Sequence, residues 1–152
     1  MLYLLAFVIG IVAGLRAMLA PAAIAWAARC GWLHLEGSWL AFLGSRWTAP
    51  VWSLVALAEI VNDKLPKTPS RTVPPQFAAR VAMGALGGAA IGIQAGAWWL
   101  GLLLGAAGAV AGTLGGAKAR GALARAFGRD LPAALGEDAI AILLAALVVN
   151  AL

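Results

Sequence analysis

Residues 81–117 form a run of 37 residues that contains no charged side chain. A helix that crosses the bilayer needs about 20 consecutive apolar residues, so this run is long enough for two crossings. The remainder of the chain is similar, because 63% of its 152 residues are hydrophobic and only 11% are charged. A soluble domain has about 25% charged residues. The sequence therefore predicts an all-α integral membrane protein.

Five apolar segments predict about five transmembrane helices in one transmembrane domain that covers residues 1–152. The first segment is interrupted only by Arg16 and has no basic residues before it. We therefore interpret it as a span and not as a cleaved signal peptide. Prolines separate the second segment from the third. The expected spans are residues 2–28, 50–65, 77–97, 98–117 and 131–151.

The distribution of basic residues predicts an orientation. With alternating crossings, only Arg29 and Arg46 fall on one side of the membrane, and eight Lys or Arg residues fall on the other. Cytoplasmic loops carry an excess of Lys and Arg, so we expect the N-terminus in the cytoplasm and the C-terminus outside. All seven tryptophans lie near the expected outer interface, as an aromatic belt would. The eight residues are Lys64, Lys67, Arg71, Arg80, Lys118, Arg120, Arg125 and Arg129.

Glycines recur at every fourth position in the third and fourth predicted spans. Gly84, Gly88 and Gly92 form one such series, and Gly108 and Gly112 belong to another. Residues four apart share one face of a helix, and a face of small residues lets two helix backbones approach closely in lipid. The spacing predicts a glycine zipper between the third and fourth helices. The same faces could instead join two copies in a homo-oligomer.

Two short matches suggest an internal repeat. The string GIVAGLR at residues 10–16 resembles GAVAGTL at residues 108–114, and ALAE at residues 56–59 resembles ALGE at residues 134–137. If the first two spans match the fourth and fifth, the third span reverses the orientation of the second half. The result is an inverted-topology repeat of the first two spans with the last two, an architecture found in many transporters.

Ionisable residues lie inside the predicted spans. An Arg in hydrocarbon costs at least about 2.5 kcal/mol on insertion scales. Arg16 and Glu59 are expected at similar depths on neighbouring helices, so we predict that they pair. Glu59 and Asp63 share a helix face. The residues expected to line or gate a polar centre are Arg16, Glu59, Asp63, Lys64, Arg71, Arg80, Lys118, Arg120, Glu137 and Asp138.

These charges have three interpretations. They form a pathway for a solute or a proton, which is the usual role of ionisable residues inside a membrane. Alternatively, the ion pairs only hold helices together, or they take part in membrane-embedded catalysis. The basic residues near the cytoplasmic side, including Lys64 and Arg71, are either ordinary positive-inside charge or a seat for a phosphate or carboxylate.

Several functional classes are poorly supported by the sequence. Cys30 and His34 are the only cysteine and histidine, which argues against a disulfide, a His-rich metal site and a Ser-His-Asp triad. We assign no catalytic residue, metal or cofactor. Nucleic acid is not an expected partner, because no soluble basic domain is present to bind it.

The chain resembles a family of small bacterial integral-membrane proteins that is described only as a domain of unknown function. The resemblance is carried by GLRAMLAPA at residues 14–22, ALAEIVNDKLPKTPSR at 56–71, Arg80 with GALGGAAIG at 84–92, and ED at 137–138. It spans most of the chain. It implies a protein of the bacterial cytoplasmic (inner) membrane and implies no particular activity.

The leading functional hypothesis is a small transporter or channel-like protein. It would move a small solute, an ion or an anionic lipid headgroup through the polar centre. One alternative is a membrane enzyme that acts on a phosphorylated lipid, with basic residues on the phosphate and Asp63 or Glu59 as base or metal ligand. The other is a membrane scaffold or assembly protein with glycine faces as its interface.

Overall fold

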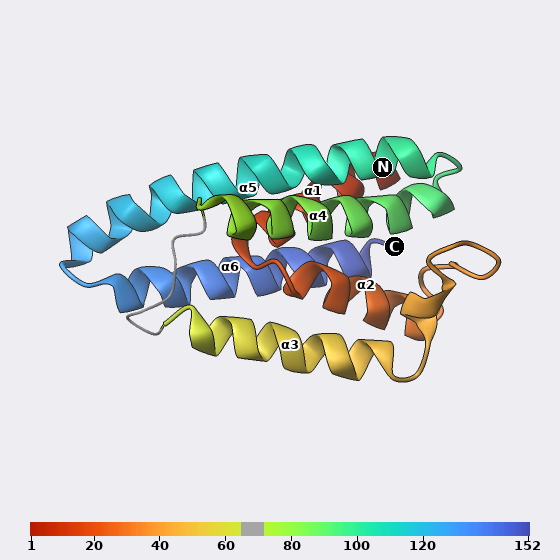
Figure 1. Ribbon diagram of the computed structural model, residues 1–152, viewed down its shortest axis with the longest axis horizontal. Coiled ribbons are helices and arrows are strands. Elements are labelled where there is room, and N and C mark those ends of the chain that lie inside the picture. The colour runs from red at the N-terminus through yellow and green to blue at the C-terminus, as the bar shows by residue number, and fades with distance from the viewer. Residues whose placement is uncertain (65–71) are drawn as a thin grey trace.

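The computed structural model describes residues 1–64 and 72–152, so the predicted site residue Arg71 lies outside the described residues. The described residues are helical and contain no strand. Figure 1 shows the helices side by side along one long axis. They are α1 (Leu2–Leu15), α2 (Leu19–Arg29), the short 3-10 helix η1 (Ala41–Gly44), α3 (Thr48–Asn62), α4 (Pro74–Gln94), α5 (Trp98–Phe127) and α6 (Asp130–Asn150).

Three of the described helices, α4, α5 and α6, are long and apolar enough to cross a membrane. At about 1.5 Å per residue, the 21 residues of α4 and of α6 extend about 31 Å each, and the 30 residues of α5 extend about 45 Å. The helix α5 continues ten residues beyond the predicted span because residues 118–127 are mostly good helix formers. It ends at Gly128, which adopts the left-handed conformation that favours glycine.

The first predicted span is not one helix. The chain leaves the helical conformation at Arg16, whose φ and ψ of −140° and 104° are extended, and a second helix begins at Leu19. The two helices run in opposite directions. Tyr3 at the start of α1 donates a hydrogen bond to the carbonyl of Ala95, and the backbone of His34, after α2, donates to the side chain of Gln94. Both ends of this hairpin therefore lie at the C-terminal end of α4.

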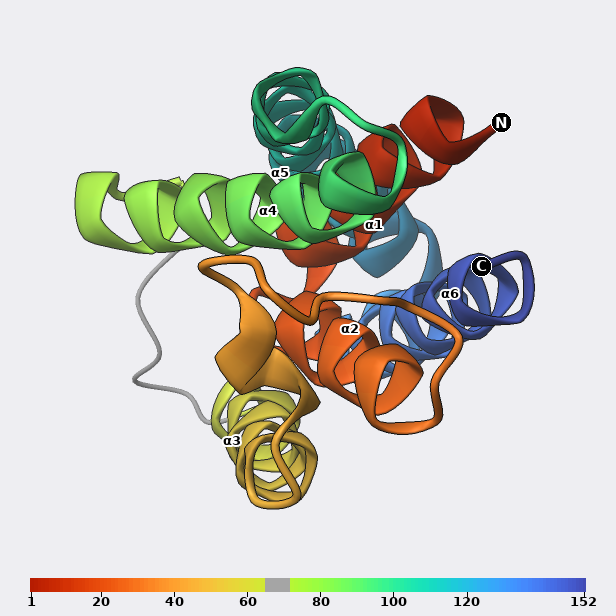
Figure 2. The same cartoon turned by 90° about the vertical axis from the view of Figure 1, so that its right-hand side faces the viewer.

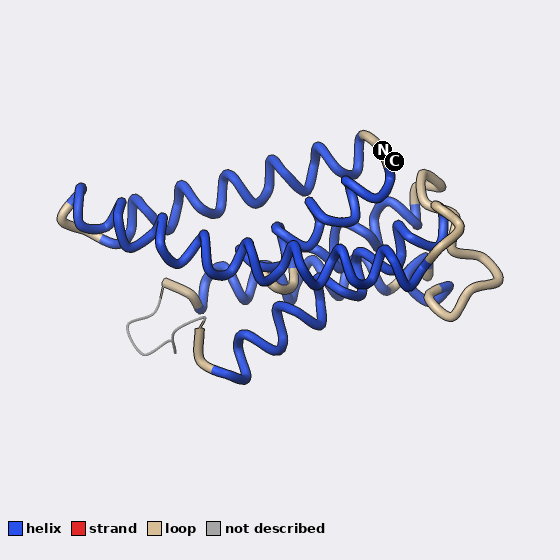
Figure 3. Tube along the Cα trace, turned by 90° about the horizontal axis from the view of Figure 1, so that it is seen from above, coloured by secondary structure: helices blue, strands red, loops and turns tan. Residues whose placement is uncertain are grey.

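This α1–α2 hairpin changes the topology that the sequence predicts. A hairpin enters and leaves on one side, so the count of five crossings is not reproduced. Figures 1 and 3 show the N- and C-termini at the same end of the molecule. This arrangement does not match the predicted termini on opposite sides of the membrane, and the side that each terminus faces stays a prediction. At the same end, Trp39 packs edge to face on Trp98, with ring centroids 6.1 Å apart.

Backbone contact at glycines holds α1, α4 and α5 together. A β-carbon on Gly84 would lie 2.7 Å from the carbonyl oxygen of Gly105, and one on Gly92 would lie 2.9 Å from the Cα of Gly101. Real β-carbons do not approach that closely, so these contacts require glycine. The helix α1 meets α5 in the same way, because a β-carbon on Gly14 would lie 2.6 Å from the backbone nitrogen of Thr113.

These contacts explain the two matching strings GIVAGLR and GAVAGTL. Gly10 and Gly14 of the first string pack against the segment of α5 that contains Gly108 and Gly112 of the second. The helices α1 and α5 run in the same direction, because Tyr3 lies near the start of α5 and Gly14 lies near Thr113. An inverted repeat would require the matching helices to run in opposite directions. The match therefore reflects two small-residue faces that pack together.

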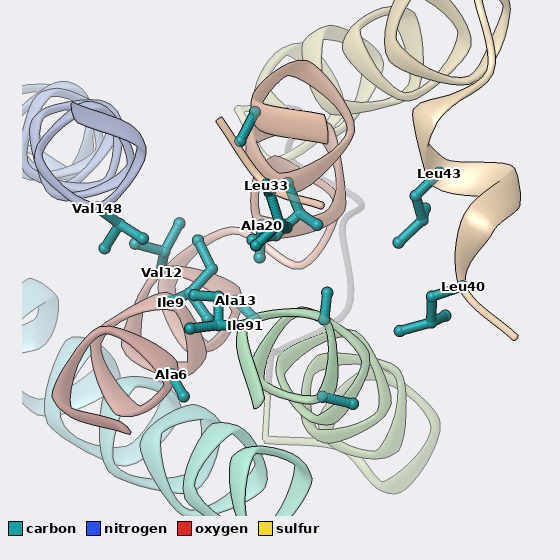
Figure 4. Packing of buried hydrophobic residues seen from close by; sticks show 14 of the residues in the cluster. Ala6, Ile9, Val12, Ala13, Ala20, Leu33, Leu40, Leu43, Ile91 and Val148 are labelled. Carbon is teal, nitrogen blue, oxygen red and sulfur yellow. The ribbon is translucent and has the colours of Figure 1, made fainter. Parts of the chain in front are cut away.

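The apolar core lies around the hairpin, and α3 lies outside it. Figure 4 shows Ile9, Val12 and Ala20 of the hairpin beside Ile91 of α4 and Val148 of α6. In Figure 2, α3 stands apart from α4 and α6 and lies beside α2. Only Ala49 and Ala56 of α3 are buried. The helix α3 is therefore held by little apolar packing.

Candidate functional site

The tip of the α1–α2 hairpin exposes two helix ends to the interior of the bundle. The last carbonyls of a helix and its first N–H groups have no partners within the helix. At the end of α1, Arg80 of α4 donates from Nη1 to the carbonyls of Gly14 and Leu15, at 2.9 and 2.7 Å. Thr113 of α5 also donates to the Gly14 carbonyl, at 3.3 Å. A buried cation thus satisfies the negative end of α1.

The start of α2 is satisfied by a carboxylate from α3. The backbone N–H groups of Ala17 and Met18 donate to Oε1 and Oε2 of Glu59, both at 2.9 Å. Oε1 also lies 3.6 Å from Nη2 of Arg80. An acidic group is favourable at the positive end of a helix. Glu59 and Arg80 therefore hold the broken ends of the hairpin from opposite sides.

Arg16 occupies the tip itself and is fully buried. Its Nε donates to Oδ1 of Asp138 at 2.6 Å, and Nη2 lies 2.6 Å from the same oxygen. Its Nη1 lies 2.8 Å from Oδ2 of Asp63. The predicted pair of Arg16 with Glu59 is wrong. The chain breaks at Arg16, so the exposed N–H groups after it bind Glu59, while the guanidinium reaches Asp63 on α3 and Asp138 on α6.

Two further cations extend this network. Nζ of Lys64 lies 2.6 Å from Oδ2 of Asp138 and also donates to the carbonyl of Ile60. Nη1 of Arg120 lies 2.5 Å from Oδ2 of Asp63 and 3.6 Å from Oε2 of Glu137. The result is a chain of alternating charges that joins the hairpin tip to α3, α5 and α6.

The inner part of the network lies inside the bundle, whereas Asp130 at the start of α6 is exposed. Arg80 is six residues into α4, and Asp138 is eight residues into α6. At about 1.5 Å per residue, these positions are about 9 and 12 Å from the helix starts. Five of the six acidic residues of the chain belong to this polar centre, together with four basic residues. The nine residues are Arg16, Glu59, Asp63, Lys64, Arg80, Arg120, Asp130, Glu137 and Asp138.

Most of the residues that the sequence analysis selected are brought together in this centre. Lys118 is the exception among the described ones: it is exposed on α5 and forms no ion pair with any residue that the structure describes. Arg71 lies outside the described residues. Lys118 is therefore a charged residue outside the polar centre, and its substitution can serve as a control.

The sequence analysis missed part of the centre. Asp130 contacts Nη2 of Arg120 at 2.5 Å, and Thr113 bonds the end of α1. The backbone groups of Ala17 and Met18 are also part of it. One signal for the break was present in the sequence. Pro21 lies in the first turn of α2, where proline is tolerated, whereas inside a continuous span it would remove a helical hydrogen bond.

A groove of about 780 Å³ opens beside Glu59. Its walls come from α3, from the hairpin tip and from the first turns of α4. A smaller pocket of about 70 Å³ lies between α5 and α6 beside Arg120 and Glu137. Within the described residues, no three His, Cys, Asp or Glu side chains are grouped as metal ligands would be. The lining residues of the larger groove are Ala17, Met18, Leu54, Val55, Leu57, Ala58, Glu59, Val61, Asn62, Gln76 and Ala79.

Comparison with known proteins places the chain in a family. No curated protein and no solved structure matches it. A family model described as Domain of unknown function (DUF4126) matches residues 3–151, which is nearly the whole chain. The match confirms the resemblance that the sequence strings indicate. The chain therefore belongs to the family described as Domain of unknown function (DUF4126).

Proposed function

We propose that this protein moves a small solute, an ion or a lipid headgroup across the membrane through the polar centre at the hairpin tip. The observation that carries the proposal is the broken α1–α2 hairpin, whose two helix ends meet buried charges in the middle of a helical bundle. Broken helices in membrane proteins are tolerated where they are buried in protein or line a cavity. In many transporters they hold the substrate or the coupling ion.

The helix α3 is the element that moves in this mechanism. It buries only two alanines, and polar contacts at its C-terminal end attach it to the rest of the bundle. Displacing that end would separate Glu59 from the start of α2 and Asp63 from Arg16. The freed N–H groups and charges would then face the groove. The position of the groove beside Glu59 favours a transport pathway over a role as a purely structural scaffold.

The remaining helices form the frame against which α3 moves. We infer that Gly84, Gly88 and Gly92 act as a glycine zipper that fixes α4 on α5, since their β-carbons would overlap the backbone of α5. Helices in such direct contact have little freedom to slide. A homo-oligomer through glycine faces stays a prediction, as does the lipid-phosphate enzyme.

The basic end of the molecule points to the cytoplasm in this proposal. Lys118, Arg125 and Arg129 lie at the end opposite the two termini. By the positive-inside rule, the protein sits in the bacterial cytoplasmic membrane with both termini outside. In this proposal the C-terminus keeps its predicted location, and the hairpin supports an N-terminus on the same side.

A flux assay tests the proposal. The purified protein is reconstituted into liposomes, and the passage of small cations, anions, amino acids and labelled lipids is followed. Asp138→Asn removes a charge from the centre while preserving shape, so any detected flux should fall by about tenfold or more, as expected if about 1.4 kcal/mol of charge stabilisation is lost. Lys118→Gln removes a charge at the basic end of the molecule but outside the polar centre, so it should leave the flux unchanged.

Glu59→Gln provides the second arm. It keeps the size of the side chain but removes its charge and leaves a single acceptor oxygen, so only one of the two N–H groups before α2 keeps its partner. The flux should change in either direction, because the closed position of α3 is weakened. A flux that both Asp138→Asn and Glu59→Gln leave at the wild-type rate would rule out the mechanism.

A further inference from the structure

The groove beside Glu59 has walls of different polarity at its two ends. Along α3, Leu54, Val55 and Ala58 line the part toward the tryptophan-bearing end. Glu59 and Asn62 follow toward the basic end, and Gln76 in the first turns of α4 lies opposite them. The groove is therefore mainly apolar toward the tryptophan-bearing end and carries its polar side chains toward the end of the molecule with the basic residues.

The groove also opens on exposed apolar side chains, Leu54, Leu57 and Val61, which would face hydrocarbon in a membrane. Its long wall is the apolar helix α3, and the first turns of the candidate span α4 contribute Gln76 and Ala79. The apolar side chains along an open groove of this kind make better dispersion contacts with a hydrocarbon chain than with water. At about 780 Å³, it is as large as the pockets that bind whole small molecules.

We propose that this groove binds one phospholipid of the surrounding bilayer. The acyl chain lies along Leu54, Val55 and Ala58, and the headgroup lies at the polar end formed by Glu59, Asn62 and Gln76. The order of apolar and polar side chains matches that of a phospholipid whose headgroup faces the basic side of the membrane. The lipid enters from the side, because α3 packs on α2 and stands apart from α4.

The bound lipid also identifies the transported class, and this second step rests on the proposed function. The headgroup end of the groove includes Glu59, which closes the start of α2. A lipid seated there is next to the polar centre that its headgroup would have to cross. The solute that moves is then a lipid headgroup with its chain remaining in the hydrocarbon.

Binding is tested by filling the groove. Ala58→Trp on α3 and Ala79→Trp on α4 place an indole in the groove from opposite walls and leave the ion pairs intact. Ala107→Trp on α5 is the matched control, because that alanine is exposed and does not line the groove. Each purified, delipidated variant is titrated with an equimolar mixture of phosphatidylethanolamine and phosphatidylglycerol, and native mass spectrometry counts the lipids that each protein retains.

The wild type and Ala107→Trp should retain one phospholipid. Both groove variants should retain it about tenfold less, which corresponds to the loss of about 1.4 kcal/mol of binding. Glycerophosphoethanolamine, a headgroup without chains, should not compete with it. Equal retention by all three variants would overturn the proposal, as would displacement of the lipid by the free headgroup. A dimer joined by a disulfide in a Cys30→Ser, Ala58→Cys variant would also overturn it, because a second copy would then cover the groove.

The binding assay is separate from the flux assay, so the two proposals can fail independently. Loss of lipid in the groove variants with no lipid movement in liposomes would support the site and refute lipid transport. Movement of an ion that the groove variants leave unchanged would support the proposed function and refute the lipid as its substrate.

Discussion

Replacing Arg16 by Met should destabilise the bundle strongly, and the loss should shrink when its partner is also made apolar. Arg16→Met removes the contacts at 2.6 Å to Asp138 and at 2.8 Å to Asp63. Breaking a buried ion pair by removing one partner costs about 3–5 kcal/mol of unfolding free energy. Both carboxylates keep a second cation, because Lys64 lies 2.6 Å from Asp138 and Arg120 lies 2.5 Å from Asp63. We therefore expect the lower end, about 3 kcal/mol.

The partner change completes a double-mutant cycle. Asp138→Leu alone leaves the buried guanidinium of Arg16 with Asp63 only, so it should also cost about 3 kcal/mol. In the double variant, Arg16→Met with Asp138→Leu, both members of the pair are gone, Asp63 keeps Arg120, and only the partly exposed Lys64 loses its carboxylate. Replacing a whole buried pair by apolar residues is often close to neutral. The double variant should lose about 3 kcal/mol or less, well short of the sum of the two single losses.

The assay is equilibrium unfolding in mixed detergent micelles, followed by far-ultraviolet circular dichroism. Arg125→Met is the control, because Arg125 is exposed and pairs with no residue that the structure describes. Its unfolding free energy should stay within about 0.5 kcal/mol of wild type. If the losses of the two single variants simply add in the double variant, within about 0.5 kcal/mol, Arg16 and Asp138 do not interact and the assignment of the hairpin tip is refuted.

Gly84→Ala should destabilise the protein by about 1–3 kcal/mol, because the new β-carbon would lie 2.7 Å from a backbone oxygen of α5. Gly115→Ala meets no atom within 4 Å and should be neutral or slightly stabilising; equal effects of the two changes would contradict the direct contact of α4 and α5. Glu59→Gln should speed hydrogen exchange of the Ala17 and Met18 amides just before α2, measured by mass spectrometry, since two charged acceptor oxygens are replaced by one neutral acceptor. Cys30 and a cysteine placed at Leu2 should react with a membrane-impermeant maleimide from the same side of the membrane, whereas one continuous first span would put them on opposite sides; labelling from opposite sides would contradict the hairpin.

The class of the protein and the composition of its polar centre could be read from the sequence. The charge-free run at residues 81–117 predicts membrane helices, and most of α4 and of α5 is built from this run. Ionisable residues are rare in such a chain, so those in or beside the predicted spans were the candidates, and most of the selected ones do meet at the hairpin tip.

The ion-pair partners within the polar centre could not be predicted from the sequence in the same way. Helical periodicity predicts depth and face, and by that criterion Glu59 was a suitable partner for Arg16. The backbone itself competes for charged groups once a helix is broken, and periodicity takes no account of that competition. Glu59 binds the freed N–H groups of Ala17 and Met18, so Asp63 and Asp138 are left for Arg16.

By itself the sequence determined that the chain enters the membrane and carries its charges to one region. Only the tertiary structure decided that the first apolar segment turns back at Arg16. Pro21 permits a helix start near that point, but a break in hydrocarbon persists only if its open carbonyls and N–H groups find partners. Those partners, Arg80 and Glu59, lie 66 and 41 residues away along the chain from groups that they bind. Such distant contacts exist only once the other helices are in place.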